Sequence, residues 1–570
     1  MSARPEASYD PLADPDAARA AEVLRGLMRR LTALVGSDEL TEPDMVGVMA
    51  IYNEVAYTVS CVDAFGDPAG SSEVDSLREF FYDNPALDCR ILEQLLVLHC
   101  ADPEAEAARL EYVNQLRREL ARDQGNDDRT AELVATARES LARFDSGQRD
   151  LLERLGVKSS ADSGAVFDKL VSATGSQAVR AKLLRARDAL RDPRLPGIVD
   201  QIVALRRDGT GSGVPNALSE TRIRLRSSAG DVAAFLHAYL AEAVSRASTG
   251  QGRTDPQPAG RPGVTTFELQ ECLQYAFDIA HAVFGITFRT SPGRTADLVV
   301  AVAEDSAAQE LGTVVFDLWQ APHKTIAANH ASGIRNRTDW GGVRQLPVAH
   351  VSCRFPHREG RLTFRNAHTL FHEFGHAVNH LLVRQRLSYL SGLEYLPPER
   401  REHLSMWFEK WVHHNAFAER FGHSDDLAAD RSLDRAQARD KAVERGVLAF
   451  VDFDVHHSRR TLRQSYDALD ERYGVSRFYA FEEIPAQFVQ PRYLQHPGAD
   501  FGYLWGAADS AAKFAAFREL SLDRIRGTPE TAVMFAECFD FSLPTTVPDC
   551  SAAFEATAAV PAKGTQAWSL

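Results

Sequence analysis

The chain has 570 residues, with 64 basic and 79 acidic side chains and a formal net charge of −15. A chain of this length can bury a large core, and its negative charge disfavours binding to nucleic acid or to acidic membrane surfaces. Its 7 cysteines are scattered without any Cys-x-x-Cys pair, so we expect neither a disulfide framework nor a cysteine metal site.

The beginning of the chain bears on where the protein acts. Residues 1–15 are polar and contain proline, without the apolar core of a signal peptide. No stretch of the chain approaches about 18 uninterrupted apolar residues, the length that predicts a membrane span. We therefore expect a soluble cytoplasmic protein with no membrane attachment.

Helical periodicity dominates the first part of the chain. Alanine, leucine, arginine and glutamate recur at helical spacing in five segments: 16–35, 87–101, 104–122, 129–155 and 179–190. Residues 209–213 read Gly-Thr-Gly-Ser-Gly, but no Gly-Lys-Ser/Thr follows, so this segment predicts a plain loop. Residues 246–262 are rich in Gly, Pro, Ser and Thr and predict an exposed loop. We expect this loop to separate an N-terminal helical region, residues 1–260, from a second region, residues 261–570.

Residues 371–376 read Phe-His-Glu-Phe-Gly-His, and this motif is the most informative feature of the second region. The surrounding apolar residues follow helical spacing, which predicts a helix from an N-cap at Asn366 to about Gln385. On that helix His372 and His376 lie one turn apart on the same face, where two imidazoles can bind one Zn²⁺. Glu373 can then remove a proton from the metal-bound water, the usual chemistry of peptide hydrolysis.

The motif alone is not decisive, because three fixed positions arise by accident in roughly a few per cent of chains this long. Gly375 adds context: glycine costs about 1 kcal/mol of helix propensity, so it indicates the close approach of another element. A catalytic zinc site also needs a third protein ligand. The candidates downstream are Glu394, Glu399, Glu402 and Glu409, although a solvated carboxylate is the commoner role for any one of them. Glu402 and Glu409 are two turns apart, so one could bind the metal and the other support it.

The segment 369–382 resembles the zinc-binding helix of the thimet oligopeptidase family, which includes neurolysin, oligopeptidase A and mitochondrial intermediate peptidase. Residues 391–393 resemble the turn that follows this helix in the family. Residues 402–411 resemble the next family element, whose first glutamate completes the zinc site. The resemblance implies that His372, His376 and Glu402 bind one zinc ion per chain, and with Glu402 as the ligand the spacing leaves Glu409 as the candidate for the supporting role.

The resemblance extends over roughly residues 265–545. Residues 311–319 and 346–355 are similar to two family strands, and both runs are short and partly β-branched, as strands should be. The family fold is mainly α, with two helical halves that flank a deep channel and a small β-sheet beside the zinc site. It implies a zinc metalloendopeptidase, of the oligopeptidase kind, that cleaves short or unfolded peptides and makes residues 261–570 the catalytic region.

One segment departs from the family pattern. Family members carry a histidine and several tyrosines that stabilise the oxyanion and hold the substrate backbone. Here Gln490 takes the place of the histidine, His496 that of the first tyrosine and Asp500 that of a later one, while Tyr503 is retained in Gly-Tyr-Leu-Trp. The resemblance therefore assigns the oxyanion contact to Tyr503, with Gln490 and His496 as candidates for substrate contact.

The remaining histidines divide into two groups. His323 and His330 precede the zinc helix and are candidates for substrate contact. His380 and the pairs at 413–414 and 456–457 predict packing or hydrogen-bonding side chains, because the pairs lack a partner one turn away.

Three functions stay open on the sequence alone: a general zinc oligopeptidase, a dedicated processing hydrolase for one peptide or amide, and a non-catalytic peptide-binding relative. Retention of Glu373 disfavours the last, since binding alone does not require a general base. The native metal and the physiological substrate are not determined by these residues.

Overall fold

The computed structural model describes most of the chain: residues 10–37, 39–66, 72–122, 126–157, 163–208, 221, 224–249, 260–293, 297–321, 324, 329–356, 359–525, 529–543 and 545–555. The loop expected at 209–213, most of the loop expected at 246–262, and His323 lie outside these residues.

The chain forms two compact units, and neither is continuous in sequence. Unit 1 comprises Met1–Leu120, Ile223–Ala442 and Phe501–Leu570, and unit 2 comprises Ala121–Arg222 and Val443–Asp500. These boundaries do not coincide with the division expected between residues 260 and 261, which stays a prediction of where the catalytic region begins.

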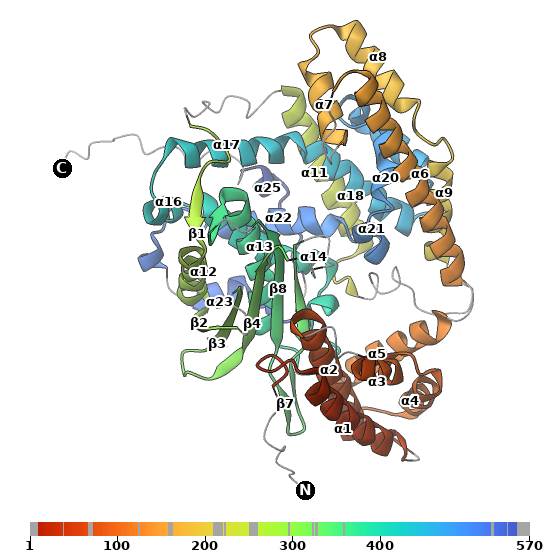
Figure 1. Cartoon of the computed structure of the whole chain (residues 1–570), viewed down its shortest axis with the longest axis vertical. Helices are drawn as coiled ribbons and strands as arrows, with labels where there is room; N and C mark the ends of the chain where they lie inside the picture. The colour runs from red at the N-terminus through yellow and green to blue at the C-terminus, as the bar shows by residue number, and fades with distance from the viewer. Residues whose placement is uncertain are drawn as a thin grey trace, which may run out of the picture. The chain divides into compact units, whose positions relative to one another are not determined.

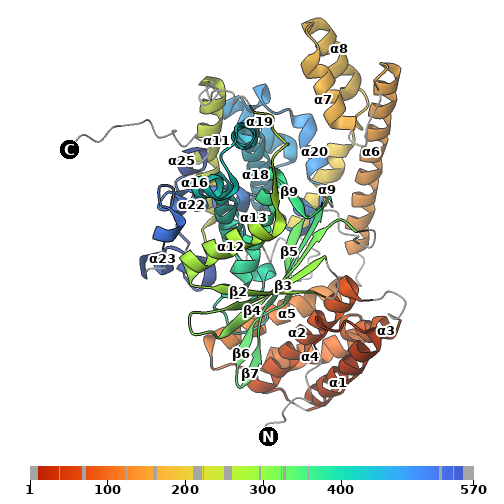
Figure 2. The same ribbon diagram turned by 60° about the vertical axis from the view of Figure 1, so that its left-hand side comes forward.

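Unit 1 begins with a group of five helices, shown in red to orange in Figure 2: α1 (Ala17–Val35), α2 (Glu42–Phe65), α3 (Ser72–Tyr82), α4 (Pro85–Val97) and α5 (Pro103–Arg122). Asp16 caps α1 by accepting a hydrogen bond from the Arg19 amide, and Thr41 with Asp44 forms a capping box at α2. α2 is the one helix among the described residues that is long and apolar enough to cross a membrane, but 72% of that stretch is buried inside the protein. It is therefore accounted for as a core helix.

A five-stranded sheet forms the centre of unit 1 (Figure 1). Its strands are β2 (Thr287–Pro292), β3 (Leu298–Glu304), β4 (Glu310–Trp319), β8 (Val348–Phe355) and β5 (His330–Arg335), in that spatial order. β4 and β8 are parallel, and the other neighbours are antiparallel. The strands expected at 311–319 and 346–355 correspond to β4 and β8. Two short antiparallel pairs complete the strands: β1 (Thr266–Glu268) with β9 (Arg361–Thr363), and β6 (Thr338–Trp340) with β7 (Val343–Gln345).

Helices α12 (Leu269–Phe284) and α13 (Phe364–Leu382) share a core with this sheet. Three phenylalanines join them: the ring of Phe374 lies 5.6 Å from that of Phe277 on α12 and 6.1 Å from that of Phe316 on β4. Such aromatic pairs add to the energy of burial itself and hold α13 in a fixed position on the sheet.

The rest of unit 1 is helical: α11 (Ala229–Thr249), η2 (Leu393–Tyr395), α14 (Pro398–Arg401), α15 (His403–Glu409), η3 (Lys410–His413), α16 (Asn415–Phe421), α17 (Asp425–Asp440), α22 (Phe501–Phe514), η6 (Leu522–Arg524), α23 (Pro529–Met534), α24 (Ala536–Phe539) and α25 (Ser551–Glu555). Trp407 and Trp411 from the α15 region and Trp505 from α22 are fully buried here.

The described part of unit 2 is entirely helical: α6 (Asn126–Arg154), α7 (Ser163–Ala173), α8 (Gln177–Asp188), α9 (Leu195–Asp208), α18 (Ala442–His457), α19 (Leu462–Tyr473), η4 (Val475–Arg477), η5 (Phe481–Glu483), α20 (Ile484–Gln487) and α21 (Pro491–Gln495). The protein is thus mainly α with small sheets, as the sequence predicts.

Candidate metal centre

The motif helix α13 continues directly from strand β9. Thr363, the last residue of β9, caps the helix, and its hydroxyl accepts a hydrogen bond from the Asn366 amide. The prediction of Asn366 as the N-cap is therefore wrong by one turn, because Asn366 supplies the amide that is capped. The helix ends at Leu382, three residues before the predicted end.

His372, His376 and Glu402 come together as the spacing and the resemblance predict. Oε2 of Glu402 lies 3.4 Å from Nε2 of His372 and 3.3 Å from Nε2 of His376. The three donor atoms all lie within 4.8 Å of one another, and Glu402 is only 4% exposed. Two imidazole nitrogens and one carboxylate oxygen are the donor set of a catalytic zinc site.

Glu402 reaches the histidines because α15 lies very close to α13. A Cβ added at Gly375 would lie 2.5 Å from Cα of Ser405 and 2.6 Å from the carbonyl oxygen of Leu404, so only glycine fits there. The close approach that Gly375 indicates in the sequence is therefore present, and the approaching element is the one that follows Glu402.

Further hydrogen bonds hold the donor atoms in place. Nδ1–H of His372 donates to Oε2 of Glu409 at 3.0 Å, which orients the ring so that Nε2 faces Glu402. The Ser405 hydroxyl donates to Oε2 of Glu402 at 3.1 Å. Glu409 is thus the supporting carboxylate that the sequence indicates. Ser405 is not among the predicted site residues, although the segment 402–411 keeps the serine of the family pattern at this position.

The ionisation of both glutamates follows from these neighbours. Burial by itself raises the pKa of Glu402, but the neighbouring His376 and His372 outweigh burial and hold this pKa well below its usual range. Burial likewise acts to raise the pKa of Glu409, yet His368 and His372 lower it to about 2. Both side chains are therefore carboxylates at neutral pH.

A second polar group adjoins Glu409. Nε2 of His368 lies 4.0 Å from Oε2 of Glu409 and 4.0 Å from Oδ2 of Asp434, and Nε2 of His413 lies 3.0 Å from the same Asp434 oxygen. His413 thus pairs with Asp434, but the ligand atoms of His368, His413 and Asp434 all lie within 4.8 Å of one another and could also hold a metal ion, so the expectation that His413 is not a ligand stays a prediction. His368 is four residues before His372, so its place on the same helix face could have been read from the sequence.

The other candidate ligands do not join this cluster. Glu399 accepts hydrogen bonds from the backbone amides of Arg226 and Ser227, and burial raises its pKa. Glu394 is likewise absent from the metal-ligand groups found among the described residues. His380 is fully buried and is bonded to the Arg335 carbonyl, in agreement with its expected packing role.

Tyr503 is placed by a glycine pair on α22. A Cβ at Gly502 would lie 2.3 Å from the carbonyl oxygen of Pro398, and one at Gly506 would lie 2.9 Å from the carbonyl carbon and Cβ of Glu402. These glycines, one turn apart, bring α22 against the segment that carries Glu402. Tyr503, next to Gly502, is half-buried.

The remaining predicted site residues lie on other elements. Gln490 and His496 cap the two ends of α21 in unit 2, and His330 begins β5, opposite Ser352 of β8. Asp500 is buried, and the exposed Arg492 and the buried Tyr493 both donate hydrogen bonds to its carboxylate. This pairing gives the acid at the predicted tyrosine position a structural role within unit 2.

Comparison with known proteins agrees with this geometry. Residues 260–527 match the model of peptidase family M3. This region is similar to peptidase family M3. The M3 match contains the motif helix α13, the Glu402 segment and Tyr503, and the predicted resemblance to the oligopeptidases of this family is confirmed.

Individual M3 relatives are distant. The organellar oligopeptidase A of Arabidopsis thaliana is 23% identical over 301 residues, which cover 47% of this chain and 37% of the relative. Oligopeptidase A of Escherichia coli is 24% identical over 278 residues, covering 44% of this chain and 40% of the relative. The matched part of the chain thus spans about two fifths of the length of these relatives. A carboxypeptidase structure from Pyrococcus furiosus has a TM-score of 0.50 at 11% identity, over 94% of this chain and 98% of that one, a likeness of fold alone.

Proposed function

We propose that the chain is a metallopeptidase in which His372, His376 and Glu402 hold one zinc ion. The observation that carries the proposal is the convergence of two imidazole nitrogens and one buried carboxylate oxygen, with Glu373 on the same helix as the histidines. The donor set fits zinc, because a buried carboxylate needs a positive partner and Nδ1 of His372 is already committed to Glu409. When bound, zinc supplies Lewis-acid chemistry that polarises a carbonyl and acidifies water.

The protein's own residues supply the proton transfers and the positioning. Glu373 is 7% exposed and lies next to His372 in the sequence, so its carboxylate is available to take the proton of the attacking water and to pass it to the leaving amine. Tyr503 carries a phenol that can donate a hydrogen bond to the oxygen of the tetrahedral intermediate. Glu409 and Ser405 keep His372 and Glu402 in position.

The proposed substrates are short or unfolded peptides, since the relatives of this chain include oligopeptidases A from a plant and a bacterium. The second candidate, a dedicated hydrolase for one peptide or amide, is favoured by one observation. Asp500 stands at a family tyrosine position, so this position offers no phenol to a substrate. Its carboxylate accepts hydrogen bonds from Arg492 and Tyr493 instead. His330, Gln490 and His496 stay proposed substrate contacts, and a cytoplasmic location stays a prediction.

The test is to incubate the zinc-loaded protein with a diverse peptide pool and to identify products by mass spectrometry. Glu373→Gln is the matched control, because the amide keeps the shape of the side chain but cannot accept the proton. We expect it to retain zinc and to lose at least about 100-fold in rate. Many cleaved peptides support the general oligopeptidase, and a single product supports the dedicated hydrolase. No cleavage by the zinc-loaded wild type would contradict both and favour a peptide-binding relative.

A further inference from the structure

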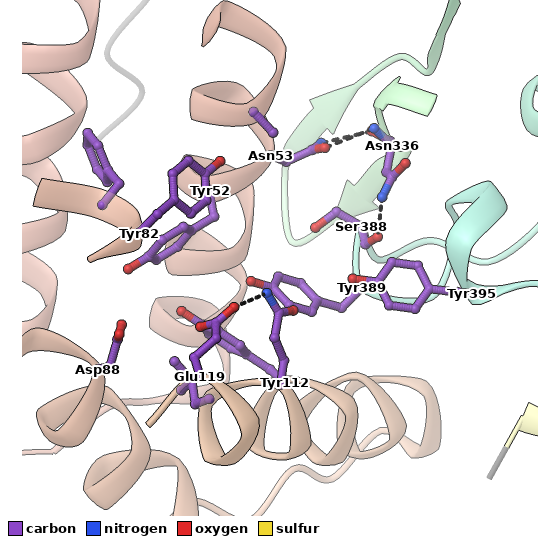
Figure 3. Close-up of a pocket in the computed structure, with 14 residues that line it drawn as sticks. Tyr52, Asn53, Tyr82, Asp88, Tyr112, Glu119, Asn336, Ser388, Tyr389 and Tyr395 are labelled. Atoms are coloured by element: carbon purple, nitrogen blue, oxygen red, sulfur yellow. Dashed lines mark hydrogen bonds between the residues drawn. The ribbon is translucent and has the colours of Figure 1, made fainter. Parts of the chain in front are cut away.

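A cavity of about 150 Å³ lies in unit 1, apart from the residues of the metal centre. Helices α2, α4 and α5 form part of it, together with residues of the segment that follows α13 (Figure 3). Its lining is rich in phenol rings, from Tyr52, Tyr82, Tyr112, Tyr389 and Tyr395. The 14 lining residues include two carboxylates, Asp88 and Glu119, and no lysine, arginine or histidine.

The tyrosines form a connected aromatic wall. The ring of Tyr112 lies 4.5 Å from that of Tyr389 and 6.1 Å from that of Tyr52, which in turn lies 6.3 Å from Tyr82. Tyr112 is only 1% exposed and Tyr389 is also buried, so surrounding atoms hold both rings in position. The face of a fixed phenol ring carries partial negative charge and attracts cations.

The two carboxylates have no positive partner within the described part of the chain. Glu119 accepts a hydrogen bond from the Gln115 side chain at 2.9 Å, and Asp88, 5% exposed, has neither an ion pair nor a side-chain hydrogen bond there. Burial, followed by the nearby charges of Glu119 and Asp83, raises the pKa of Asp88 to about 7. The cavity therefore combines carboxylates with aromatic faces. Arg224 already places its guanidinium 4.9 Å from the ring centroid of Tyr395, but it pairs with Glu111 and does not line the cavity, whereas the rings of Tyr52, Tyr82, Tyr112 and Tyr389 have no such cation among the described residues.

We propose that this cavity binds one guanidinium group, stacked against the tyrosine rings and paired with Glu119 and Asp88. A guanidinium fits better than a metal ion, because ring faces rather than further oxygen donors make up most of the wall. Its planar fork also matches a carboxylate while its flat face packs against a ring. The group can come from an arginine side chain of a peptide or from a free small molecule, which share this chemistry.

Calorimetric titration of the full chain with three probes tests the assignment. N-acetyl-arginine amide and propylguanidinium both carry the group, and N-acetyl-citrulline amide has nearly the same shape without charge. We expect both guanidinium probes to bind and the citrulline probe to bind at least about 10-fold more weakly. Tighter binding of the arginine amide indicates a peptide side chain, and tighter binding of propylguanidinium indicates a free small molecule. Equal binding of arginine and citrulline amides, or no binding of either guanidinium probe at millimolar concentration, overturns the proposal and leaves a hydrated void.

Variants locate the binding. Glu119→Gln and Asp88→Asn remove one charge each without changing shape, and each should weaken guanidinium binding at least about 10-fold. Glu93→Gln is the matched control, because Glu93 is an exposed acid on α4, the helix of Asp88, and does not line the cavity. Loss of binding in Glu93→Gln, or full binding in both cavity variants, would exclude this site. Circular dichroism checks that each variant is folded.

The pH dependence gives an independent check. The groups that face Asp88 are Asp83, Glu119 and the tyrosines, whose phenols stay neutral because burial raises the pKa of Tyr82 to about 12 and that of Tyr52 further. Asp88 therefore becomes charged near pH 7, and guanidinium binding should tighten between about pH 6 and 8 in the wild type but not in Asp88→Asn. Glu402→Ala, which removes a proposed zinc ligand, should leave guanidinium binding unchanged, so this site and the proposed hydrolysis succeed or fail separately.

Discussion

Glu402 is the residue on which the metal centre depends. The Glu402 carboxylate is buried and faces both histidines. It therefore supplies the third donor atom of the site together with a negative charge. Removing it leaves only two imidazole nitrogens, which bind zinc less tightly than a complete three-ligand site.

We expect Glu402→Ala to weaken zinc binding by more than about 100-fold, measured by competition with a chromophoric chelator. Glu409→Gln serves as the comparison, because it changes only the hydrogen bond to Nδ1 of His372. Its loss should be smaller, about 10–100-fold. Unchanged zinc affinity in Glu402→Ala would remove it from the ligand set and return attention to Glu394 and Glu399.

A catalytic role of the Tyr503 hydroxyl can be tested separately from the packing of the Tyr503 ring. Tyr503→Phe removes one hydroxyl and keeps the ring, so packing beside Gly502 should be preserved. If the phenol stabilises the oxyanion, kcat falls by about 10²–10³-fold with zinc content unchanged. Wild-type kcat would assign Tyr503 a packing role, and the oxyanion contact would then be sought at Gln490 and His496.

At the scale of elements, the metal centre depends on the contact between α13 and α15. Gly375→Ala places a methyl group 2.5 Å from Cα of Ser405, and backbone atoms cannot rotate away as a flexible side chain would. We expect a loss of about 1–3 kcal/mol in the free energy of unfolding, together with weaker zinc binding, because α15 and Glu402 are pushed from the histidines.

Gly26→Ala is a matched control within the same chain. Gly26 is also inside a helix, α1, but an added Cβ there meets nothing within 4 Å. The substitution should therefore stabilise the protein by about 0.5–1 kcal/mol, the ordinary gain in helix propensity. Chemical denaturation measures the free energy of unfolding of both variants. A change of the same sign in both would contradict a steric clash at Gly375.

The helices differ in how well the sequence predicts them. α1 and α13 are amphipathic, so their periodic apolar faces place them within a few residues. α2 has no predicted counterpart, because it is buried on nearly all sides and its apolar residues follow no single face. The N-cap of α13 was missed for a different reason: Thr363 ends a strand whose pairing with β1 is a long-range contact.

The metal centre is predictable to the extent that it is local. His372, Glu373 and His376 lie within one turn and a half of helix. Gly375, a glycine inside that helix, predicts that another element packs closely against it, and this element is α15. The choice of Glu402 among four glutamates needed the family resemblance, since spacing alone left all four open. The tyrosine cavity could not be predicted, because its lining residues come from elements far apart in sequence. Ser405 is only three residues from its partner Glu402, but helical spacing alone does not distinguish its hydroxyl from others in the segment.

For the whole molecule, the buried acid Asp88 makes stability depend on pH. Its pKa is about 7 in the folded protein and about 3.9 in an unfolded chain, so the folded state binds the proton more tightly. The contribution of Asp88 to stability is therefore complete below about pH 4 and is lost as pH rises through 7. Asp88→Asn, which cannot ionise, should gain about 1–3 kcal/mol over the wild type between pH 5 and pH 8.

Denaturation curves at the two pH values measure this gain, with Glu93→Gln as the exposed control. A wild-type advantage that grows with pH would show instead that Asp88 is paired with a cation in the folded protein.

The interruption of unit 1 by residues 443–500 sets an order of events during synthesis. The ribosome delivers the histidines and Glu402 first, whereas Tyr503 follows about one hundred residues later, an interval of roughly 5–20 s. A nascent chain can thus acquire its metal ligands before it possesses the phenol proposed for catalysis. During synthesis from the N-terminus, the chain would then pass through a stage at which it binds zinc but does not yet hydrolyse peptides.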